Sequence, residues 1–228
     1  MEIHKYNKTA LVVGATGLVG SHLVQFLILH PAYQKIIVFS RRPLPFEHPK
    51  LTVHLIDFDQ PKKWKPLVKG DDLFCCLGTT MATAGSKEAF YKVDFAYNYT
   101  AAEAALANGA NQLLLVSSVG AQADSIFYYS KVKGQLEDAV KKLDFWSVHI
   151  FQPSVLLGER NENRFGEKVA ARLGKVIDRF TGGLLTKYRP IEADVVAKSM
   201  VAAAQRLESG VHVYPSHWLQ KLAEELDG

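Results

Sequence analysis

The hydrophobic positions along the chain form two alternating kinds of segment. Short runs of apolar and β-branched residues are typical of buried strands, whereas longer stretches with apolar residues every three or four positions are typical of helices. The strand pattern occurs at residues 10–14, 35–40, 52–56, 73–77, 112–117, 146–151 and 211–214. The helix pattern occurs at residues 18–29, 87–107, 129–143, 166–180, 192–207 and 218–226.

This alternation predicts an α/β fold with a doubly wound, mostly parallel sheet of about seven strands and helices on both faces. A chain of 228 residues, 48% of them hydrophobic, is long enough to bury one substantial core. We therefore expect a single domain over residues 1–228. Polar and charged residues interrupt the alternation after Pro153, so residues 154–228 are expected to form the substrate side of a cleft.

Charge and composition exclude several classes of partner. The 27 basic and 23 acidic residues give a net charge of +4, without a dense basic block of the kind that binds nucleic acid. The chain begins without a secretory apolar stretch, and no window approaches the roughly 18 uninterrupted apolar residues that span a bilayer. We therefore expect a cytoplasmic or otherwise intracellular protein, with cytoplasmic as the leading expectation, a small-molecule substrate, no nucleic-acid partner and no membrane span.

Residue types that form disulfides or bind metals are sparse. The two cysteines, Cys75 and Cys76, are adjacent within an apolar run, where they are expected to be buried strand residues. The eight histidines show no metal-ligand spacing, and His149 lies within a predicted strand, where a hydrogen-bonded core role is expected. The sequence therefore predicts no metal site.

A glycine-rich segment follows the first predicted strand and opens the first helix. Gly14, Gly17 and Gly20 have the spacing G-x-x-G-x-x-G at this junction. Gly14 would permit the tight turn, Gly17 would let the backbone approach a pyrophosphate, and Gly20 would let the helix pack close to the sheet. The pattern predicts a dinucleotide-binding Rossmann fold. Its expected cofactor contacts are Gly14, Thr16, Gly17, Leu18, Val19 and Gly20.

The residues after the second strand indicate which dinucleotide binds. An NAD enzyme places an acidic residue there for the 2′-hydroxyl of the adenosine ribose, whereas this chain has Ser40-Arg41-Arg42. The planar guanidinium group matches phosphate geometry and favours a 2′-phosphate. The alternative is that Arg41 and Arg42 are a solvated surface pair. We therefore expect NADP(H) rather than NAD(H).

Segments after the later strands complete the expected cofactor path. Asp57 and Phe58 follow the third strand, where the carboxylate would accept a hydrogen bond from the adenine amino group and the backbone would fix the plane of the base. Gly78-Thr79-Thr80 would pass under the phosphates and ribose, because ligands lie outside the carboxyl ends of such strands. The remaining expected contacts are Leu77, Ser117, Pro153, Ser154 and Val155.

Together these segments resemble the short-chain dehydrogenase/reductase superfamily, and within it the atypical branch that includes the Tat-interacting-protein oxidoreductases. The resemblance covers essentially the whole chain and implies a single-domain protein that binds NADP(H). We expect a monomer or a homodimer. Besides the glycine loop and Ser40-Arg41-Arg42, it rests on Val116-Ser117-Ser118, Tyr129-Ser130-Lys131-Val132-Lys133-Gly134 and Gln152-Pro153-Ser154-Val155-Leu156-Leu157-Gly158-Glu159-Arg160.

The family's Tyr-x-x-x-Lys pair corresponds to Tyr129 and Lys133, which the spacing places on one face of a helix. The resemblance implies that Tyr129 is the catalytic acid/base. A free phenol has a pKa of about 10, so a lysine cation beside it is needed to favour the phenolate near neutral pH. Lys133 would also hydrogen-bond the nicotinamide ribose. The alternative is an amphipathic helix with an inward-packed tyrosine and a solvated lysine.

The resemblance also implies a catalytic serine at the end of the fifth strand. Ser118 is expected to hold the substrate oxygen, with Ser117 as the competing candidate, because adjacent strand residues point to opposite faces. The segment from Ser118 to Tyr129 spans 11 positions and is shorter than in other branches. Asn98 either fills the family's structural asparagine role or is an exposed helix residue.

Three functions are compatible with these features. The leading hypothesis is an NADP(H)-dependent oxidoreductase that transfers hydride to or from a small carbonyl or carbinol, with Tyr129 moving the proton. The second is a dinucleotide-binding regulator or scaffold without appreciable turnover. The third is a nucleotide-sugar epimerase or dehydratase, which is disfavoured by the short region after Pro153 and by Gln152, where many longer relatives have arginine.

Overall fold

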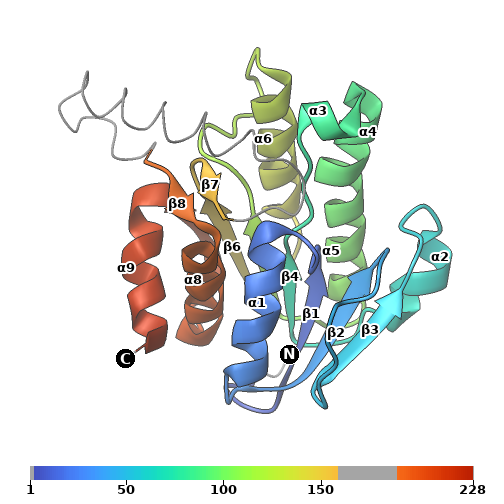
Figure 1. The fold of residues 1–228 in the computed structure, drawn as a ribbon, viewed down its shortest axis with the longest axis vertical. Helices are drawn as coiled ribbons and strands as arrows, with labels where there is room; N and C mark the ends of the chain where they lie inside the picture. Colours follow the sequence, from blue (N-terminus) through green and yellow to red (C-terminus); the bar gives the residue numbers. More distant parts are fainter. Residues whose placement is uncertain (1–2, 159–188, 228) are drawn as a thin grey trace.

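The computed structural model describes residues 3–158 and 189–227, and its central element is a seven-stranded sheet (Figure 1). Every neighbouring pair of strands is parallel, in the order β3-β2-β1-β4-β5-β6-β9. The strands are β1 (Lys8–Val13), β2 (Tyr33–Ser40), β3 (Leu51–Leu55), β4 (Asp72–Cys75), β5 (Gln112–Val116), β6 (Ser147–Gln152) and β9 (Gly210–Pro215). The chain order reverses between β1 and β4, and doubly wound folds bind ligands outside the carboxyl ends of strands at such a point.

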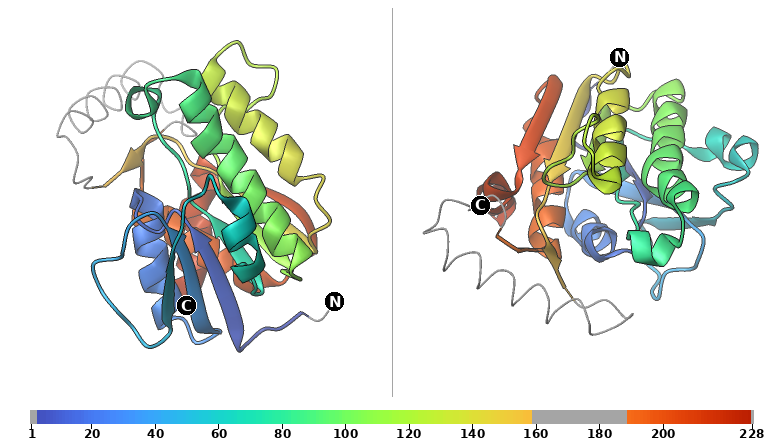
Figure 2. Two further views of the ribbon diagram at one scale, coloured as in Figure 1. Left: turned by 90° about the vertical axis from the view of Figure 1, so that its right-hand side faces the viewer. Right: turned by 90° about the horizontal axis from the view of Figure 1, so that it is seen from above.

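Helices cover both faces of the sheet (Figure 2). One face carries α1 (Leu18–Leu29), α8 (Ala193–Arg206) and α9 (Ser216–Asp227), and the other carries α5 (Tyr97–Ala107) and α6 (Tyr128–Val140). Shorter helical segments are α2 (Pro61–Trp64), η1 (Lys65–Leu67), α3 (Met81–Ala84), α4 (Lys87–Tyr91) and η2 (Lys92–Ala96). A separate two-stranded sheet pairs β7 (Leu156–Leu157) with β8 (Ile191–Glu192). The predicted doubly wound Rossmann fold is confirmed.

Two apolar clusters, one on each face, follow the alternation of side chains along the strands. Val12 and Phe74 pack with residues of α1 and α8, whereas their chain neighbours Val13 and Leu73 pack with residues of α5 and α6. Strands buried on both faces must be apolar almost throughout, which explains the continuous hydrophobic runs of the sequence. These clusters hold the carboxyl ends of β1, β4 and β5 in fixed register.

The observed strands begin and end within two residues of the predicted positions, and α1 matches its predicted range. The predicted helix at residues 87–107 is α4, η2 and α5 in succession, because η2 is a π-helical turn that interrupts the α-helical spacing. The short strands β7 and β8 were not predicted, since two residues are too few for a periodic pattern. The predicted helix at residues 166–180 lies outside the described residues.

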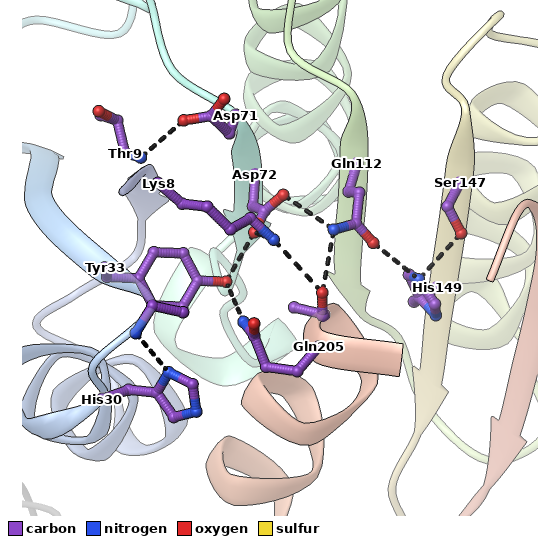
Figure 3. Close-up of polar contacts among 12 residues, drawn as sticks. Lys8, Thr9, His30, Tyr33, Asp71, Asp72, Gln112, Ser147, His149 and Gln205 are labelled. Atoms are coloured by element: carbon purple, nitrogen blue, oxygen red, sulfur yellow. Dashed lines mark hydrogen bonds and ion pairs between the residues drawn. The ribbon is translucent and has the colours of Figure 1, made fainter. Parts of the chain in front are cut away.

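A buried polar network lies at the amino ends of the central strands (Figure 3). The Nζ atom of Lys8 lies 2.5 Å from Oδ2 of Asp72, and the Tyr33 hydroxyl donates to the same oxygen at 2.6 Å. Gln112 donates to Oδ1 of Asp72 at 3.0 Å and to the Ala204 carbonyl of α8, also at 3.0 Å. The network thus joins four strands and α8. Its contacts are costly to break, because a buried charge that loses its partner is strongly destabilising.

His149 extends this network into β6. Its ring is fully buried and hydrogen-bonds the Tyr214 hydroxyl at 3.0 Å and the Ser147 hydroxyl at 2.9 Å. Burial, the largest effect, lowers the pKa of His149 to about 3, so the ring is neutral near neutral pH. His149 therefore has the hydrogen-bonded core role that its place in a strand predicts.

Candidate functional site

Gly14 forms the turn between β1 and α1 and has a left-handed backbone conformation, with a φ of +86°. A Cβ atom on Gly14 would lie 2.6 Å from the backbone nitrogen of Leu77, and one on Gly20 would overlap the backbone of Gly14. Both positions therefore require glycine, because a side chain would push α1 away from the sheet or disrupt the segment after β4.

The amino end of α1 has the properties of a phosphate-binding site. Thr16 and Gly17 are exposed, and Gly17 precedes the helix without a side-chain capping hydrogen bond. The first turn of α1 contains no acidic residue, so its free N–H groups face no competing carboxylate from that turn. Leu18 is half-buried and Val19 belongs to the core, which leaves mainly their backbone for contact with a ligand. The loop fits the pyrophosphate of a dinucleotide.

The segment after β2 presents two arginines at the surface. The buried Ser40 side chain accepts a hydrogen bond from the backbone N–H of Arg42 at 3.2 Å, which fixes the turn that ends the strand. Arg41 and Arg42 are both exposed. Their charges therefore lie at the carboxyl edge of the sheet, where doubly wound folds bind their ligands.

Asp57 and Phe58, after β3, differ in exposure. The exposed carboxylate of Asp57 accepts hydrogen bonds from the backbone N–H of Asp59 at 2.9 Å and from the side chain of Gln60 at 2.7 Å. The buried Phe58 ring stacks on Tyr97, with ring centroids 5.0 Å apart. Only the backbone of Phe58 is left for the contact with adenine that the sequence predicts.

The segment after β4 bends over the carboxyl edge of the sheet and contains the predicted contacts Leu77, Gly78, Thr79 and Thr80. The backbone N–H of Thr79 donates to Oδ2 of Asp94 at 2.8 Å, and the Leu77 carbonyl accepts from the side-chain amide of Asn98 at 3.2 Å. Gly78 and Thr80 are exposed. Two side chains from the helical segment η2–α5 thus hold this loop in place.

Tyr129 and Lys133 lie one turn apart on α6 in contrasting surroundings. The Tyr129 side chain is 37% exposed and packs against Phe90, with ring centroids 5.5 Å apart. Lys133 is buried, and its Nζ atom lies 2.8 Å from Oδ1 of Asp94. A Cβ atom on Gly78 would lie 3.5 Å from that oxygen and 3.6 Å from the lysine nitrogen. The alternative of an inward tyrosine and a solvated lysine is therefore wrong.

The electrostatic surroundings of Lys133 favour its charged form. Burial disfavours the ammonium group, but the charges of Asp94, Tyr129 and Glu137 together with the hydrogen bond to Asp94 outweigh this effect. The pKa of Lys133 is therefore raised above its ordinary value. Lys133 is a fixed cation below the exposed backbone of Gly78.

Asp94 is a candidate functional residue that the sequence reasoning missed. It lies fully buried in η2, and Asn98 stabilises that π-helical turn by donating to the Val93 carbonyl at 3.2 Å. Asn98 is itself buried, so the alternative of an exposed helix residue is wrong. π-Helical turns are frequent at functional sites, but helical periodicity does not reveal them. The one available signal was an acidic residue among the aromatic residues of this helix.

Ser117 and Ser118 point in different directions at the end of β5. The Ser117 hydroxyl is buried and donates to Oε1 of Glu137 at 2.5 Å, and Gln152 donates to the same carboxylate at 3.0 Å. Ser118 is half-buried, and among the described residues its hydroxyl has a single long contact, 3.4 Å from the Val119 carbonyl. Ser118 is therefore freer to hold a substrate oxygen, whereas Ser117 is bound to Glu137.

Of the cofactor contacts predicted after β6, Pro153 and Ser154 form hydrogen bonds with other residues of the protein. The Pro153 carbonyl accepts a hydrogen bond from Val119 at 2.9 Å, and the buried Ser154 hydroxyl donates to the Arg189 carbonyl. Val155 is exposed. This segment connects β6 to the two-stranded sheet, and residues 159–188 of the predicted substrate side lie outside the described part of the chain.

Other chemistry is limited in the described ranges, 3–158 and 189–227. Among these residues, no helix combines the length and the apolar character needed to cross a membrane, and no three metal-binding side chains gather into a site. Cys75 and Cys76 are free, and burial raises the pKa of both thiols, that of Cys76 to about 12. Neither cysteine is a reactive thiolate near neutral pH.

Comparison with known proteins identifies relatives over nearly the whole chain. Residues 10–213 match the NAD dependent epimerase/dehydratase family. The chain is 36% identical to Protein FMP52, mitochondrial, of Candida albicans, over 96% of this chain and 100% of that protein. It is 36% identical to Protein HTATIP2 of Rattus norvegicus, over 78% of this chain and 75% of that protein. The solved UDP-N-acetylglucosamine 4-epimerase of Methanobrevibacter ruminantium has the same fold, with a TM-score of 0.67 at 14% identity over 92% of this chain and 77% of that one.

The names of these relatives correct one expectation from the sequence. FMP52 proteins of several yeasts are named as mitochondrial, so the expectation of a cytoplasmic protein is wrong. That expectation relied on the lack of a secretory apolar stretch, which does not argue against mitochondria, because mitochondrial targeting segments are amphipathic.

The matched region includes the glycine loop, the strand-order reversal, and the Tyr129–Lys133 pair with its buried partner Asp94. The match to the FMP52 protein of Candida albicans covers 96% of this chain. The chain belongs to the NAD dependent epimerase/dehydratase family, within the NAD(P)-binding Rossmann proteins of the short-chain dehydrogenase/reductase superfamily.

Proposed function

We propose that the protein is an NADP(H)-dependent oxidoreductase that interconverts a small carbonyl compound and its carbinol. One observation carries the proposal: α6 presents a partly exposed Tyr129 one turn from the buried, charged Lys133, at the carboxyl edge of the sheet. A surface phenol beside a fixed cation suits proton exchange with a substrate oxygen. The glycine loop and the uncapped end of α1 suit the dinucleotide.

Each of the chain's own groups has a distinct task in this proposal. The nicotinamide, when bound, supplies or accepts the hydride. Tyr129 gives the substrate oxygen a proton in the reductive direction and removes one in the oxidative direction. Ser118 orients that oxygen by a hydrogen bond. Lys133 places a positive charge one turn from Tyr129 and hydrogen-bonds the ribose next to the nicotinamide.

The preference for NADP(H) rests on the segment after β2. Arg41 and Arg42 are exposed there, and the strand ends in Ser40 instead of the acidic residue that binds a free ribose 2′-hydroxyl. Two guanidinium groups at this edge favour a phosphate. We therefore expect NADPH to bind more tightly than NADH.

A comparison of wild type with Tyr129→Phe tests the catalytic assignment. Oxidation of NADPH is followed by its absorbance against a panel of aldehydes, ketones and quinones, with cofactor affinity measured separately. We expect turnover by the wild type, at least about a hundredfold less turnover by the variant, and equal NADPH affinity for the two. Cofactor binding without turnover in either protein would favour the regulator or scaffold instead. Failure of the wild type to bind either cofactor would refute the proposal.

The family match favours a second candidate, an epimerase or dehydratase that uses its cofactor transiently. Such an enzyme regenerates the cofactor in every cycle and has no need to release it. The discriminating measurement is the cofactor content of the purified protein. Nicotinamide dinucleotide that survives purification and dialysis would favour the epimerase, whereas freely exchangeable NADPH favours the reductase.

A further inference from the structure

The buried pair of Asp94 and Lys133 joins three elements at the edge of the sheet. Asp94 projects from η2, bonds the loop after β4 through the Thr79 N–H at 2.8 Å, and pairs with Lys133 of α6 at 2.8 Å. The two side chains are 0% and 5% exposed. The backbone of Gly78 lies directly above both, and Gly78 itself is exposed. A ligand resting on Gly78 would be separated from a buried anion and cation only by a glycine.

The charges of this pair balance each other. One carboxylate faces one ammonium group, and Thr79 contributes only a neutral N–H. The next acidic group on α6, Glu137, is bound to Ser117 and Gln152, with Lys141 3.6 Å from its Oε2 atom. Loss of either member of the Asp94–Lys133 pair would therefore leave one uncompensated charge under Gly78.

The pair lies in the half of the sheet that would receive the nicotinamide, an argument that rests on the proposed function. In doubly wound folds the two halves of a dinucleotide lie on either side of the point where the strand order reverses, here between β1 and β4. Arg41 and Arg42 follow β2 on the adenosine side, whereas Gly78 and Tyr129 lie on the other side. The oxidised nicotinamide ring carries a positive charge and the reduced ring is neutral.

We propose that Asp94 is a positioning residue that neutralises Lys133 beneath the nicotinamide site and thereby sets the relative affinity for the oxidised and reduced cofactor. The pair lets the site keep a lysine cation for Tyr129 without repelling a cationic ring. This role is distinct from holding the loop, since a loop contact would affect both forms of the cofactor equally.

The test measures dissociation constants for NADP⁺ and NADPH separately, by calorimetry and without turnover. Asp94→Asn removes the charge and keeps an oxygen for the Thr79 N–H. We expect the ratio of the NADP⁺ constant to the NADPH constant to rise about tenfold, measured at pH 6.5 because a lower pH favours the charged form of Lys133. Lys133→Met leaves the opposite charge and is expected to lower the ratio by a similar factor.

The double variant Asp94→Asn/Lys133→Met restores neutrality and is expected to return the ratio to the wild-type value. Glu103→Gln is the matched control, because it neutralises a carboxylate on the same helical segment in an exposed pair, 3.7 Å from Lys65. If each single variant changed the dissociation constants for NADP⁺ and NADPH by the same factor, the inference would be overturned and Asp94 would be a structural residue. If the wild type bound neither form, the proposed function itself would fail.

Discussion

Among residues 3–158 and 189–227, two buried lysine–aspartate pairs occur, one at each edge of the same sheet. Lys8 and Asp72 lie at the amino edge, 2.5 Å apart, with Tyr33 and Gln112 also bound to the carboxylate (Figure 3). Lys133 and Asp94 lie at the carboxyl edge, 2.8 Å apart, beside exposed Gly78 and a partly exposed tyrosine. The first pair is enclosed by protein groups, whereas the second lies just beneath the surface.

This difference shows how one chemical motif serves two purposes. At the amino edge Lys8 and Gln112 both donate to the Ala204 carbonyl, so the network joins strands to α8 and contributes to stability. At the carboxyl edge the pair lies where doubly wound folds bind ligands. Substitutions at the amino edge should therefore lower stability and leave cofactor affinity intact, whereas those at the carboxyl edge should change binding or turnover.

The largest expected effect is that of Asp72→Asn on stability. The variant leaves the buried Lys8 without its counter-ion, and such a loss costs roughly 3–5 kcal/mol of the free energy of unfolding. Urea unfolding measures the change, with the exposed pair of Lys65 and Glu103 as the control, because Glu103→Gln should cost less than about 1 kcal/mol. Cofactor affinity at a temperature where Asp72→Asn is folded should equal that of wild type. If the two variants lost the same free energy of unfolding, the buried network would stabilise the fold no more than an exposed ion pair does.

His149 makes the stability of the amino edge sensitive to acid. Its pKa is lowered to about 3 in the fold by burial, whereas the unfolded chain takes up the proton near pH 6.5. The stabilising contribution of the neutral ring is therefore present above pH 6.5 and is lost progressively as the pH falls toward 3. At pH 4 the loss amounts to roughly 3 kcal/mol relative to pH 7.

Comparison with His149→Gln isolates this contribution. Free energies of unfolding for the two proteins are measured between pH 7 and pH 4, and the carboxylates that both proteins share cancel in the difference. The difference in free energy of unfolding between wild type and variant should become smaller as the pH falls. Parallel curves over this range would show that His149 does not titrate differently in the folded and unfolded states.

The two edges also differ in how far the sequence predicts them. Hydrophobic alternation predicts the strands, and the spacing of Gly14, Gly17 and Gly20 predicts the loop at the carboxyl edge, because both are local patterns. The pairing of Lys133 with Asp94 joins residues 39 positions apart through a π-helical turn, and the pairing of Lys8 with Asp72 joins strands that only the sheet order makes adjacent. Such contacts depend on tertiary packing and leave no periodic signal.

The two serines at the end of β5 test, within the carboxyl edge alone, the contrast between a residue that serves stability and one that serves turnover. Ser117→Ala removes a hydrogen bond to the buried Glu137 carboxylate and should cost roughly 1.5–3 kcal/mol of stability with little effect on turnover. Ser118→Ala should leave stability within about 0.5 kcal/mol of wild type and lower turnover roughly tenfold or more. Thermal unfolding and NADPH oxidation, measured on both variants, show which serine is catalytic and which is structural. The reverse pattern would make Ser117 the catalytic serine.

The smallest expected effect concerns the exposed charges of the carboxyl edge. Arg41→Ala should weaken NADPH binding about tenfold and leave NADH binding unchanged, because only NADPH carries the 2′-phosphate. Lys35→Ala is the matched control, since Lys35 is an exposed cation within β2, the strand that precedes Arg41, and lies several residues before the carboxyl end of that strand. Because Arg41 is solvent-exposed, the difference between variant and wild type should shrink between about 0.01 and 0.5 M salt, whereas the effect of the buried Asp94 should persist. If Arg41→Ala lost NADPH and NADH affinity equally, the NADP(H) preference would have no basis. If the effects of the Arg41 and Asp94 substitutions on cofactor affinity shrank equally with salt, the distinction between surface and buried charges at this edge would be contradicted.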